Sequence, residues 1–211
     1  MNKLKQVFTI GHSTHQLEYF IKLIKSQKIN TLIDIRSMPA SKYNPQYNKD
    51  SFEYFLQSKG IKYMHFGFEF GARHDDEDFL DDDGMVNFIK FRRSFQFQNG
   101  IERLDIGISN GYNIVLMCSE GDPLECHRFS MISVYLEEIG IVVKHIMKDG
   151  SMQLHKDLEQ GLLEKYSKKL LTPDLFNPNV DTNDQLKQAY KLHNKDIGWH
   201  SENNHNEDLY K

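Results

Sequence analysis

The sequence is poor in several residue types, and each shortage excludes a class of protein. Its 211 residues include two cysteines, five prolines and one tryptophan. Two cysteines eight positions apart cannot form the disulfide framework of a small secreted domain, and they fit a reducing compartment, where a Cys118–Cys126 bridge would serve only as a redox switch. No apolar run approaches the roughly 18 residues of a membrane-spanning helix, and the N-terminus lacks a signal-peptide core. We therefore expect a cytoplasmic protein that makes no membrane contact.

The charge balance is uneven along the chain. Residues 1–74 carry eleven Lys or Arg against five acidic residues, whereas residues 75–83 carry seven acidic residues and no base. The acidic run lacks the alternating Asp spacing and the distal Glu of an EF-hand, so we interpret it as a solvated loop leading into a helix near Met85. The basic N-terminal third could meet an anionic partner, which keeps nucleic acid open as a ligand.

Short apolar runs alternate with segments of helical period. Strands are expected at Phe8–Ile10, Thr31–Ile35, Ile61–His65, Ile114–Met117 and Ile141–Ile146. Such an alternation predicts an α/β fold with a mainly parallel five-stranded sheet and helices on both faces. Helices are expected after capping boxes at Ser13 with Gln16 and at Asp50 with Glu53, over Met85–Ser109 with an interruption near Gly100, and over His127–Glu138.

The C-terminal part of the sequence differs in composition. We assign residues 1–170 to a single α/β domain. Residues 171–211 are rich in Asn, Asp and Pro, and they contain one expected helix, Asp184–His193, and the single tryptophan, Trp199. We interpret this part as a polar, partly ordered C-terminal extension.

The stretch NIVLMCSEGDPLECHR, residues 113–128, carries the densest chemistry. A buried strand is expected to end at Cys118, a polar loop follows, and Cys126, His127 and Arg128 open a helix. Open α/β folds place ligands at the carboxyl ends of their strands. The first two strands run into further polar residues at the same edge, and the backbone N–H groups of the helix starts after Ser13 and Cys126 would face it, so we expect a crevice that binds an anionic group.

The candidate residues fall into two groups. Candidate catalytic residues are Cys118, His12, Glu120 and His127, and candidate substrate-binding residues are Gly11, Ser13, Asp34, Arg36, Ser41, Tyr43, Arg73 and Arg128. Several residues of this region also have a structural interpretation. Cys118 could be a small buried hydrophobic residue, Cys126 could pack at a helix start, and Arg36 could form a buried ion pair with a neighbour such as Glu120.

Several motifs together resemble the domain of unknown function 488 family. They are TIGHS at 9–13, LIDIRSMPAS at 32–41, GIKYMHF at 60–66 with FGAR at 70–73, LMCSE and PLECHR within 116–128, and VKHI at 143–146. The resemblance implies a shared site over residues 7–166 but no reaction, because the family is uncharacterised. At Glu69-Phe70-Gly71 the chain departs from the Leu-Gly-Gly-like segment of the family. The LIDIR strand and the later Cys-to-Arg loop also resemble the layout of rhodanese-like sulfurtransferases and cysteine phosphatases, an architectural likeness that does not transfer function.

Three functional interpretations remain open. In the first, a transferase or hydrolase uses Cys118, with a lowered pKa, as nucleophile on a small anionic substrate held by Arg36 and Arg128, while His12 or His127 moves a proton. In the second, the same crevice and a Tyr43/Tyr47 loop bind a nucleotide or nucleic acid. A metal site of His12, Cys118, Cys126 and His127 is the third; adjacent Cys and His rarely bind one ion together, so we expect no metal and no cofactor. The sequence does not indicate an oligomeric state.

Overall fold

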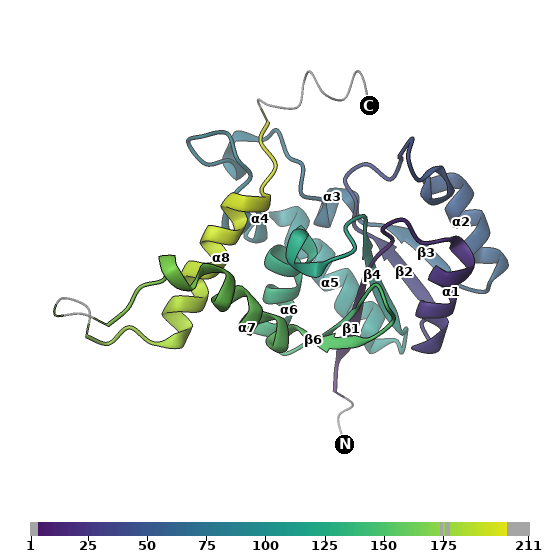
Figure 1. The fold of residues 1–211 in the computed structure, drawn as a ribbon. Coiled ribbons are helices and arrows are strands. Elements are labelled where there is room, and N and C mark those ends of the chain that lie inside the picture. The colour runs from purple at the N-terminus through teal and green to yellow at the C-terminus, as the bar shows by residue number, and fades with distance from the viewer. Residues whose placement is uncertain (1–3, 174, 176–177, 202–211) are drawn as a thin grey trace.

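A six-stranded sheet forms the centre of the computed structural model, which describes residues 4–173, 175 and 178–201 (Figure 1). The strands are β1 (Gln6–Gly11), β2 (Thr31–Asp34), β3 (Lys62–His65), β4 (Ile114–Cys118), β5 (Val142–Ile146) and β6 (Met152–Leu154), in the order β3-β2-β4-β1-β5-β6. The first five strands are parallel, and β6 runs antiparallel to β5. The α/β class and the mainly parallel sheet are thus confirmed. The sequence analysis missed β6, a three-residue edge strand too short to give an apolar run.

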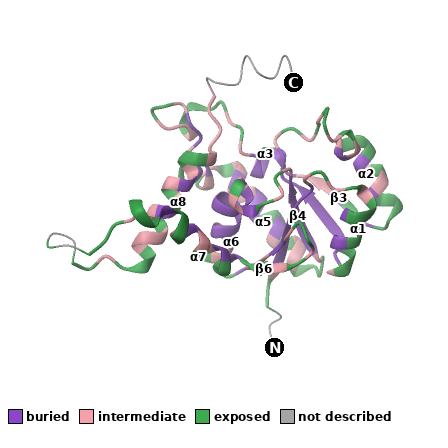
Figure 2. Ribbon diagram, in the orientation of Figure 1, coloured by how far each residue is buried: buried purple, intermediate pink, exposed green. Residues whose placement is uncertain are grey.

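Both faces of the sheet are buried (Figure 2). Successive residues of a strand point to opposite faces, and β4 shows this plainly. Val115 and Met117 belong to the core that packs under α1 (Leu17–Ser26) and α2 (Lys49–Ser58). Leu116 and Cys118 belong to the core on the other face. The alternation therefore directs the Cys118 side chain away from α1 and α2.

Helices cover that second face as well. They are α3 (Gly67–Phe70), α4 (Phe88–Arg92), α5 (Phe95–Ser109) and α6 (Val134–Glu138), followed in the chain by α7 (His155–Tyr166) and α8 (Thr182–Ile197). Short turns of 3₁₀-helix lie at η1 (Pro45–Tyr47), η2 (Glu77–Phe79), η3 (Pro123–Glu125) and η5 (Ser167–Lys169), and η4 (Arg128–Ser133) is a π-helix. The helix predicted over His127–Glu138 is therefore η4 continued by α6. Such π-turns occur frequently at functional sites.

Two predicted capping boxes are absent. Gln16 is the N-cap of α1 and makes no side-chain cap bond, while Ser13 lies outside the helix with φ of 48° and donates its N–H to Ser119. Asn48 is the N-cap of α2, and its side chain instead accepts from the N–H of Ser41. Ser13 and Asn48, which could each cap a helix, therefore hydrogen-bond to a neighbouring loop instead.

The predicted break near Gly100 is also wrong. The interruption lies between α4 and α5, where Ser94 caps α5 by accepting from the N–H of Phe97. Gly100 is inside α5, and a Cβ atom there would lie 2.7 Å from Cβ of Glu69 and 2.8 Å from Cε1 of Phe70. Glycine at this position thus permits close packing of α5 on α3 rather than a break.

The C-terminal helices pack beside the sheet. α8 packs on α7 around a third core that includes Phe129, Leu158 and Ala189. Beyond α8 the chain is fixed by two backbone hydrogen bonds, from the N–H of Val86 to Trp199 and from the N–H of Ser201 to Gly84. Residues 202–211 of the predicted extension lie outside the described residues. Among the helices that the structure describes, none is long and apolar enough to cross a membrane.

Candidate functional site

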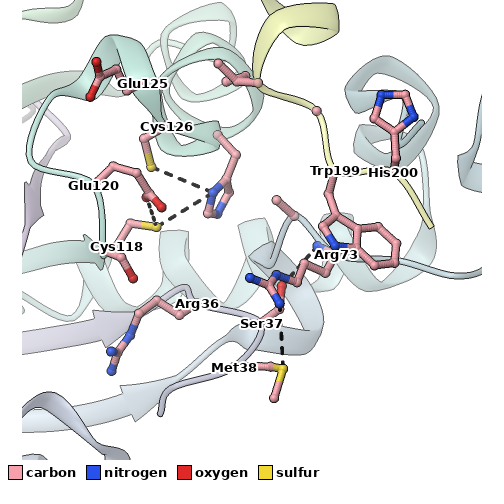
Figure 3. Close-up of a pocket in the computed structure, with 15 residues that line it drawn as sticks. Arg36, Ser37, Met38, Arg73, Cys118, Glu120, Glu125, Cys126, Trp199 and His200 are labelled. Atoms are coloured by element: carbon pink, nitrogen blue, oxygen red, sulfur yellow. Dashed lines mark hydrogen bonds between the residues drawn. The ribbon is translucent and has the colours of Figure 1, made fainter. Parts of the chain in front are cut away.

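A pocket of about 390 Å³ lies at the carboxyl edge of the sheet (Figure 3). It is lined by Arg36, Ser37, Met38, Ala72, Arg73, Cys118, Ser119, Glu120, Glu125, Cys126, His127, Ile197, Gly198, Trp199 and His200. These residues come from the loops after β2 and α3, from the end of β4 and the loop after it, and from the end of α8 and the segment that follows it. The pocket therefore joins parts of the chain that are far apart in sequence.

The loop after β4 is held tightly against β1. Gly11 pairs with Cys118 across the sheet, and a Cβ atom on Gly11 would lie 1.7 Å from the carbonyl oxygen of Glu120. Only glycine allows this approach. The N–H groups of His12 and Ser13 donate to the carbonyls of Cys118 and Ser119. Gly11 and Ser13, which we predicted to bind substrate, thus shape the loop that carries the cysteines.

Arg128 holds the same loop through hydrogen bonds from its side chain to the loop backbone. Its side chain is fully buried and donates to the carbonyls of Glu120, at 2.6 Å, and Gly121, at 3.0 Å. Its backbone N–H donates to Sγ of Cys126 at 3.4 Å. The predicted anion clamp at Arg128 is therefore not what the geometry shows, because the two terminal nitrogens of the guanidinium are bonded to main chain.

Four side chains converge at the base of the pocket. Sγ of Cys118 donates to Oε2 of Glu120 at 2.9 Å, and Nδ1 of His127 lies 3.8 Å from Sγ of both Cys118 and Cys126. The four donor atoms of Cys118, Glu120, Cys126 and His127 all lie within 4.8 Å of one another. Both cysteines are free thiols with almost no exposed surface. We call these four residues the thiol cluster.

The two thiols of the cluster differ in acidity. Burial, the hydrogen bond with Cys126 and the nearby Glu120 carboxylate raise the pKa of Cys118 well above its ordinary value. Burial also opposes ionisation of Cys126, but the adjacent Cys118 thiol and the positive charges of Arg128 and His127 outweigh it and hold the pKa of Cys126 well below the ordinary value. The lowered pKa that we predicted for Cys118 thus belongs to Cys126.

The other two members of the cluster shift with the thiols. Desolvation and the adjacent Cys126 raise the pKa of Glu120. Burial would lower the pKa of His127, but the negative charge of Cys126 and the hydrogen bond to it raise the pKa instead. Together these shifts favour the thiolate form of Cys126 and the protonated form of His127, because each charge stabilises the other.

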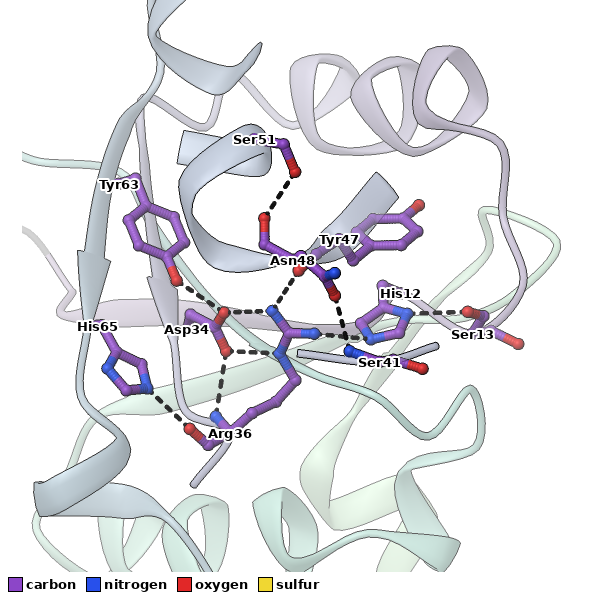
Figure 4. A network of polar contacts seen from close by, with 10 residues as sticks. All are labelled: His12, Ser13, Asp34, Arg36, Ser41, Tyr47, Asn48, Ser51, Tyr63 and His65. Atoms are coloured by element: carbon purple, nitrogen blue, oxygen red, sulfur yellow. Dashed lines mark hydrogen bonds and ion pairs between the residues drawn. The ribbon is translucent and has the colours of Figure 1, made fainter. Parts of the chain in front are cut away.

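A second polar group at this edge surrounds Arg36 (Figure 4). Nε of Arg36 donates to Oδ1 of Asp34 at 2.9 Å, and Nη2 donates to Oδ2 at 2.6 Å and to the carbonyl of Tyr47 at 2.8 Å. Asp34 also accepts from the hydroxyl of Tyr63 at 2.8 Å. Arg36 therefore makes the buried ion pair of its structural interpretation, with Asp34 in place of Glu120, and its guanidinium is occupied.

His12 completes this second group, which we call the Arg36 network. Its Nε2 accepts from Nη1 of Arg36 at 3.2 Å, so its Nδ1 carries the proton and donates to the carbonyl of Ser13 at 2.8 Å. The ring stacks on Tyr47 with centroids 4.3 Å apart. Burial, with Arg36 nearby, lowers the pKa of His12 to about 4. His12 is thus a neutral, fully bonded histidine and does not join the thiol cluster.

Three other predicted residues have different positions. Arg73 lines the pocket, and its N–H donates to Oγ of Ser37. Ser41 and Tyr43 are not among the residues that line the pocket: Oγ of Ser41 accepts from the N–H of Tyr43, whose side chain is exposed. Tyr47, which the nucleic-acid interpretation needs as a stacking surface, is buried under His12.

Ten of the fifteen residues that line the pocket were not among the predicted site residues, and Cys126 and Trp199 are the two that bear most on its chemistry. The sequence showed Cys126 beside His127 but gave no sign that the backbone changes from extended to helical between them. Trp199 lies 81 positions after Cys118, in a segment we took for an extension. The one signal in the sequence was that Trp199 is the single tryptophan. A hydrophobic pattern can indicate a helix or strand, but it does not show where a C-terminal segment packs.

Comparison with protein families places the chain in one of them. The family model described as Domain of unknown function DUF488 matches residues 16–136, more than half of the chain. Searches among curated proteins and among solved structures found no match. The matched range includes the whole thiol cluster and the Asp34–Arg36 pair, and it ends before Trp199. The chain belongs to the DUF488 family of domains of unknown function.

Proposed function

We propose that the protein is an enzyme that uses a cysteine thiolate of the thiol cluster, Cys126, to attack a small substrate in the pocket. The observation that carries this proposal is the convergence of two thiols, a carboxylate and an imidazole at the base of one cavity. A nucleophilic cysteine needs a base within reach, and it needs donors that stabilise its thiolate. His127 and the backbone N–H of Arg128 meet these needs at Cys126.

The direction of the hydrogen bonds assigns the two sulfurs different roles. Cys118 is a donor, because its Sγ lies 2.9 Å from a carboxylate oxygen of Glu120, which accepts the thiol proton. Cys126 is an acceptor, because it receives the N–H of Arg128. Cys126 is therefore the nucleophile, and Cys118 is the neighbouring thiol that holds a proton beside it.

The pocket limits the substrate. A volume of about 390 Å³ is at the small end of the range for small-molecule sites. Arg73 and His200 lie on its wall and would favour an anionic group, the role we had expected of Arg36 and Arg128. Nε2 of His127 and Nε1 of Trp199 are buried without a hydrogen-bond partner among the described residues, and a polar substrate would supply partners.

Alkylation of the reduced, chelator-treated protein by iodoacetamide tests the nucleophile. We expect Cys126 to react at least about ten-fold faster than the same cysteine in denaturant, and faster than Cys118, as resolved by peptide mass spectrometry. Turnover of small thioesters, phosphomonoesters and thiosulfate should disappear in Cys126→Ser, with Glu125→Gln as a matched control on the same wall. Equal, slow alkylation of both cysteines, or turnover that survives Cys126→Ser, would reject the proposal.

A further inference from the structure

The thiol cluster also has the donor atoms of a metal site. We propose that Cys118, Glu120, Cys126 and His127 bind one divalent metal ion that favours thiolate ligands, and that this ion is Zn²⁺. Two sulfurs, one imidazole nitrogen and one carboxylate oxygen are all established zinc donors. Within the described residues, no other group of three or more His, Cys, Asp or Glu side chains has its donor atoms close enough together to hold one metal ion.

The distances fit a tetrahedron. With Zn–S bonds of about 2.3 Å and Zn–N bonds of about 2.0 Å, a sulfur and a nitrogen on one tetrahedral ion lie about 3.6 Å apart. Nδ1 of His127 lies 3.8 Å from Sγ of Cys118 and 3.8 Å from Sγ of Cys126. The imidazole thus already stands where a shared ion would hold it relative to both thiols.

Adjacent Cys and His rarely bind one ion together, and the backbone shows why they could here. Cys126 has extended dihedrals, φ −138° and ψ 140°, whereas His127 has helical dihedrals, φ −56° and ψ −23°. At this change of backbone conformation Nδ1 of His127 lies 3.8 Å from Sγ of Cys126, so the two neighbouring side chains face the same point. The objection that we raised from the sequence therefore does not hold for this turn.

Charge also favours a divalent cation. Two thiolates and one carboxylate would bring three negative charges together, at a high cost without compensation. A divalent ion and the guanidinium of Arg128, which lies behind Glu120 and Cys126, balance these charges. In the structure the Cys118 thiol donates its proton to Glu120 at 2.9 Å. On binding, that proton and the proton on Nδ1 of the protonated His127 both leave to solvent, and the sulfur of Cys118 and the oxygen of Glu120 need to separate by only about 0.6 Å to span an edge of the tetrahedron.

The four ligands are not equivalent. Cys118 and Cys126 are buried, His127 is half-buried, and Glu120 is exposed toward the pocket. Glu120 is therefore the ligand that a solvent molecule can replace most easily. Loss of either thiol should weaken zinc binding at least about 100-fold, more than the loss of a residue that only hydrogen-bonds to a ligand, and loss of Glu120 should weaken it by about ten-fold.

The ion and the nucleophile would compete for the same sulfur. Bound zinc would hold Cys126 in a protected state, so that metal occupancy regulates the thiol chemistry; in this respect alone the inference rests on the proposed function. Metal binding itself does not depend on the reactivity of Cys126. The two proposals can therefore fail separately.

Zinc titration of the full-length, reduced and chelator-treated protein tests the site, with a chromophoric chelator as competitor. We expect one Zn²⁺ per chain, and with Co²⁺ we expect thiolate charge-transfer absorption and the intense visible bands of tetrahedral cobalt. Cys118→Ser and Cys126→Ser should lose this binding. Two pocket substitutions outside the donor set, His200→Gln and Glu125→Gln, should keep it.

A measurement on the wild-type chain avoids reliance on variants that could fail to fold. One equivalent of Zn²⁺ should slow alkylation of both cysteines at least about ten-fold, because both sulfurs become ligands. Absence of stoichiometric Zn²⁺ binding, or cobalt spectra that lack thiolate bands, would overturn the metal proposal. The metal-free alkylation rates decide the proposed nucleophile whichever result is obtained.

Discussion

The carboxyl edge of the sheet holds two polar groups that look alike in sequence but differ in how their hydrogen bonds are satisfied. In the Arg36 network, the guanidinium of Arg36 meets the carboxylate of Asp34 through two bonds, and both ring nitrogens of His12 have partners. In the thiol cluster, two of the three contacts are 3.8 Å sulfur contacts, and Nε2 of His127 has no partner among the described residues.

This difference distinguishes polar residues that hold the fold together from polar residues that are available to a ligand. Buried polar groups in folded proteins are nearly always paired, and each one left unpaired needs an explanation, such as a bound ligand, an ion or a water molecule. In the Arg36 network all three guanidinium nitrogens donate to protein atoms, whereas in the thiol cluster Nε2 of His127 has no partner among the described residues. Convergence on one sheet edge is therefore insufficient evidence of a site; we place the candidate site at the thiol cluster because its unpaired imidazole nitrogen belongs to a residue that lines the pocket.

The largest expected effect comes from breaking the Arg36 network. Arg36→Met leaves the fully buried carboxylate of Asp34 without its cation, which should lower the free energy of unfolding by about 3–5 kcal/mol. Urea denaturation followed by circular dichroism measures this. Arg73→Met, on the exposed side of the pocket, should change stability by less than about 1 kcal/mol. Similar losses in the two variants would contradict the assignment of Arg36 to the framework.

A third polar group extends the comparison away from the pocket. Thr9 donates to His145 at 2.7 Å, His145 to His155 at 3.2 Å, His155 to Tyr190 at 2.9 Å, and Tyr190 to Glu159 at 2.9 Å. Because Tyr190 donates to Glu159, every bond in the chain runs in one direction, and both histidines are neutral. Burial lowers the pKa of His155 to about 3 and the pKa of His145 well below its ordinary value.

Acid should therefore destabilise the protein through His155. Its folded pKa of about 3 lies below the ordinary value of 6.5, so the unfolded chain binds the proton more tightly between these values. Its contribution is fully present above pH 6.5 and is lost as the pH falls toward 3, by up to about 1.4 kcal/mol per pH unit. Urea unfolding between pH 6 and pH 4 should show a smaller pH slope in His155→Gln than in the wild type. Equal slopes would show that His155 keeps an ordinary pKa.

A matched pair of substitutions sharpens the comparison at the pocket itself. Glu120→Gln removes a carboxylate that stands beside thiols and has a raised pKa, so we expect stability to stay the same or to increase by up to about 1 kcal/mol. Asp34→Asn removes a carboxylate from the Arg36 network, and stability should fall by several kcal/mol, about as much as in Arg36→Met. Thermal unfolding of both variants provides the test, and a large loss in Glu120→Gln would place Glu120 in the framework.

The smallest expected effect is at Trp199. Trp199→Phe keeps an aromatic ring on the pocket wall and removes an indole N–H that has no partner among the described residues. The free energy of unfolding, measured by thermal unfolding, should therefore change by no more than about 0.5 kcal/mol. A loss of 2 kcal/mol or more would mean that the indole nitrogen has a structural partner.

The sequence was sufficient to predict features that depend on local pattern. The apolar runs identified the parallel strands, and β4 indeed ends at Cys118. Arg128, by contrast, was predicted to bind a ligand. In the structure it donates to the carbonyls of Glu120 and Gly121, and no local sequence pattern indicates that these carbonyls face it. Gly100 read as a helix break, since its contact with Glu69 depends on tertiary packing. Local pattern thus fixes elements, whereas the partner of each polar side chain is a property of the folded chain.

The position of the single tryptophan makes the pocket optically observable. Trp199 lies on the wall of the cavity that contains the thiol cluster, and the chain has no second indole to contribute background emission. Light that excites tryptophan but not tyrosine will therefore report almost entirely on this cavity. Arrival of a substrate, binding of a quenching ion such as Co²⁺, or displacement of the segment after α8 should each change the emission of the unlabelled wild-type protein.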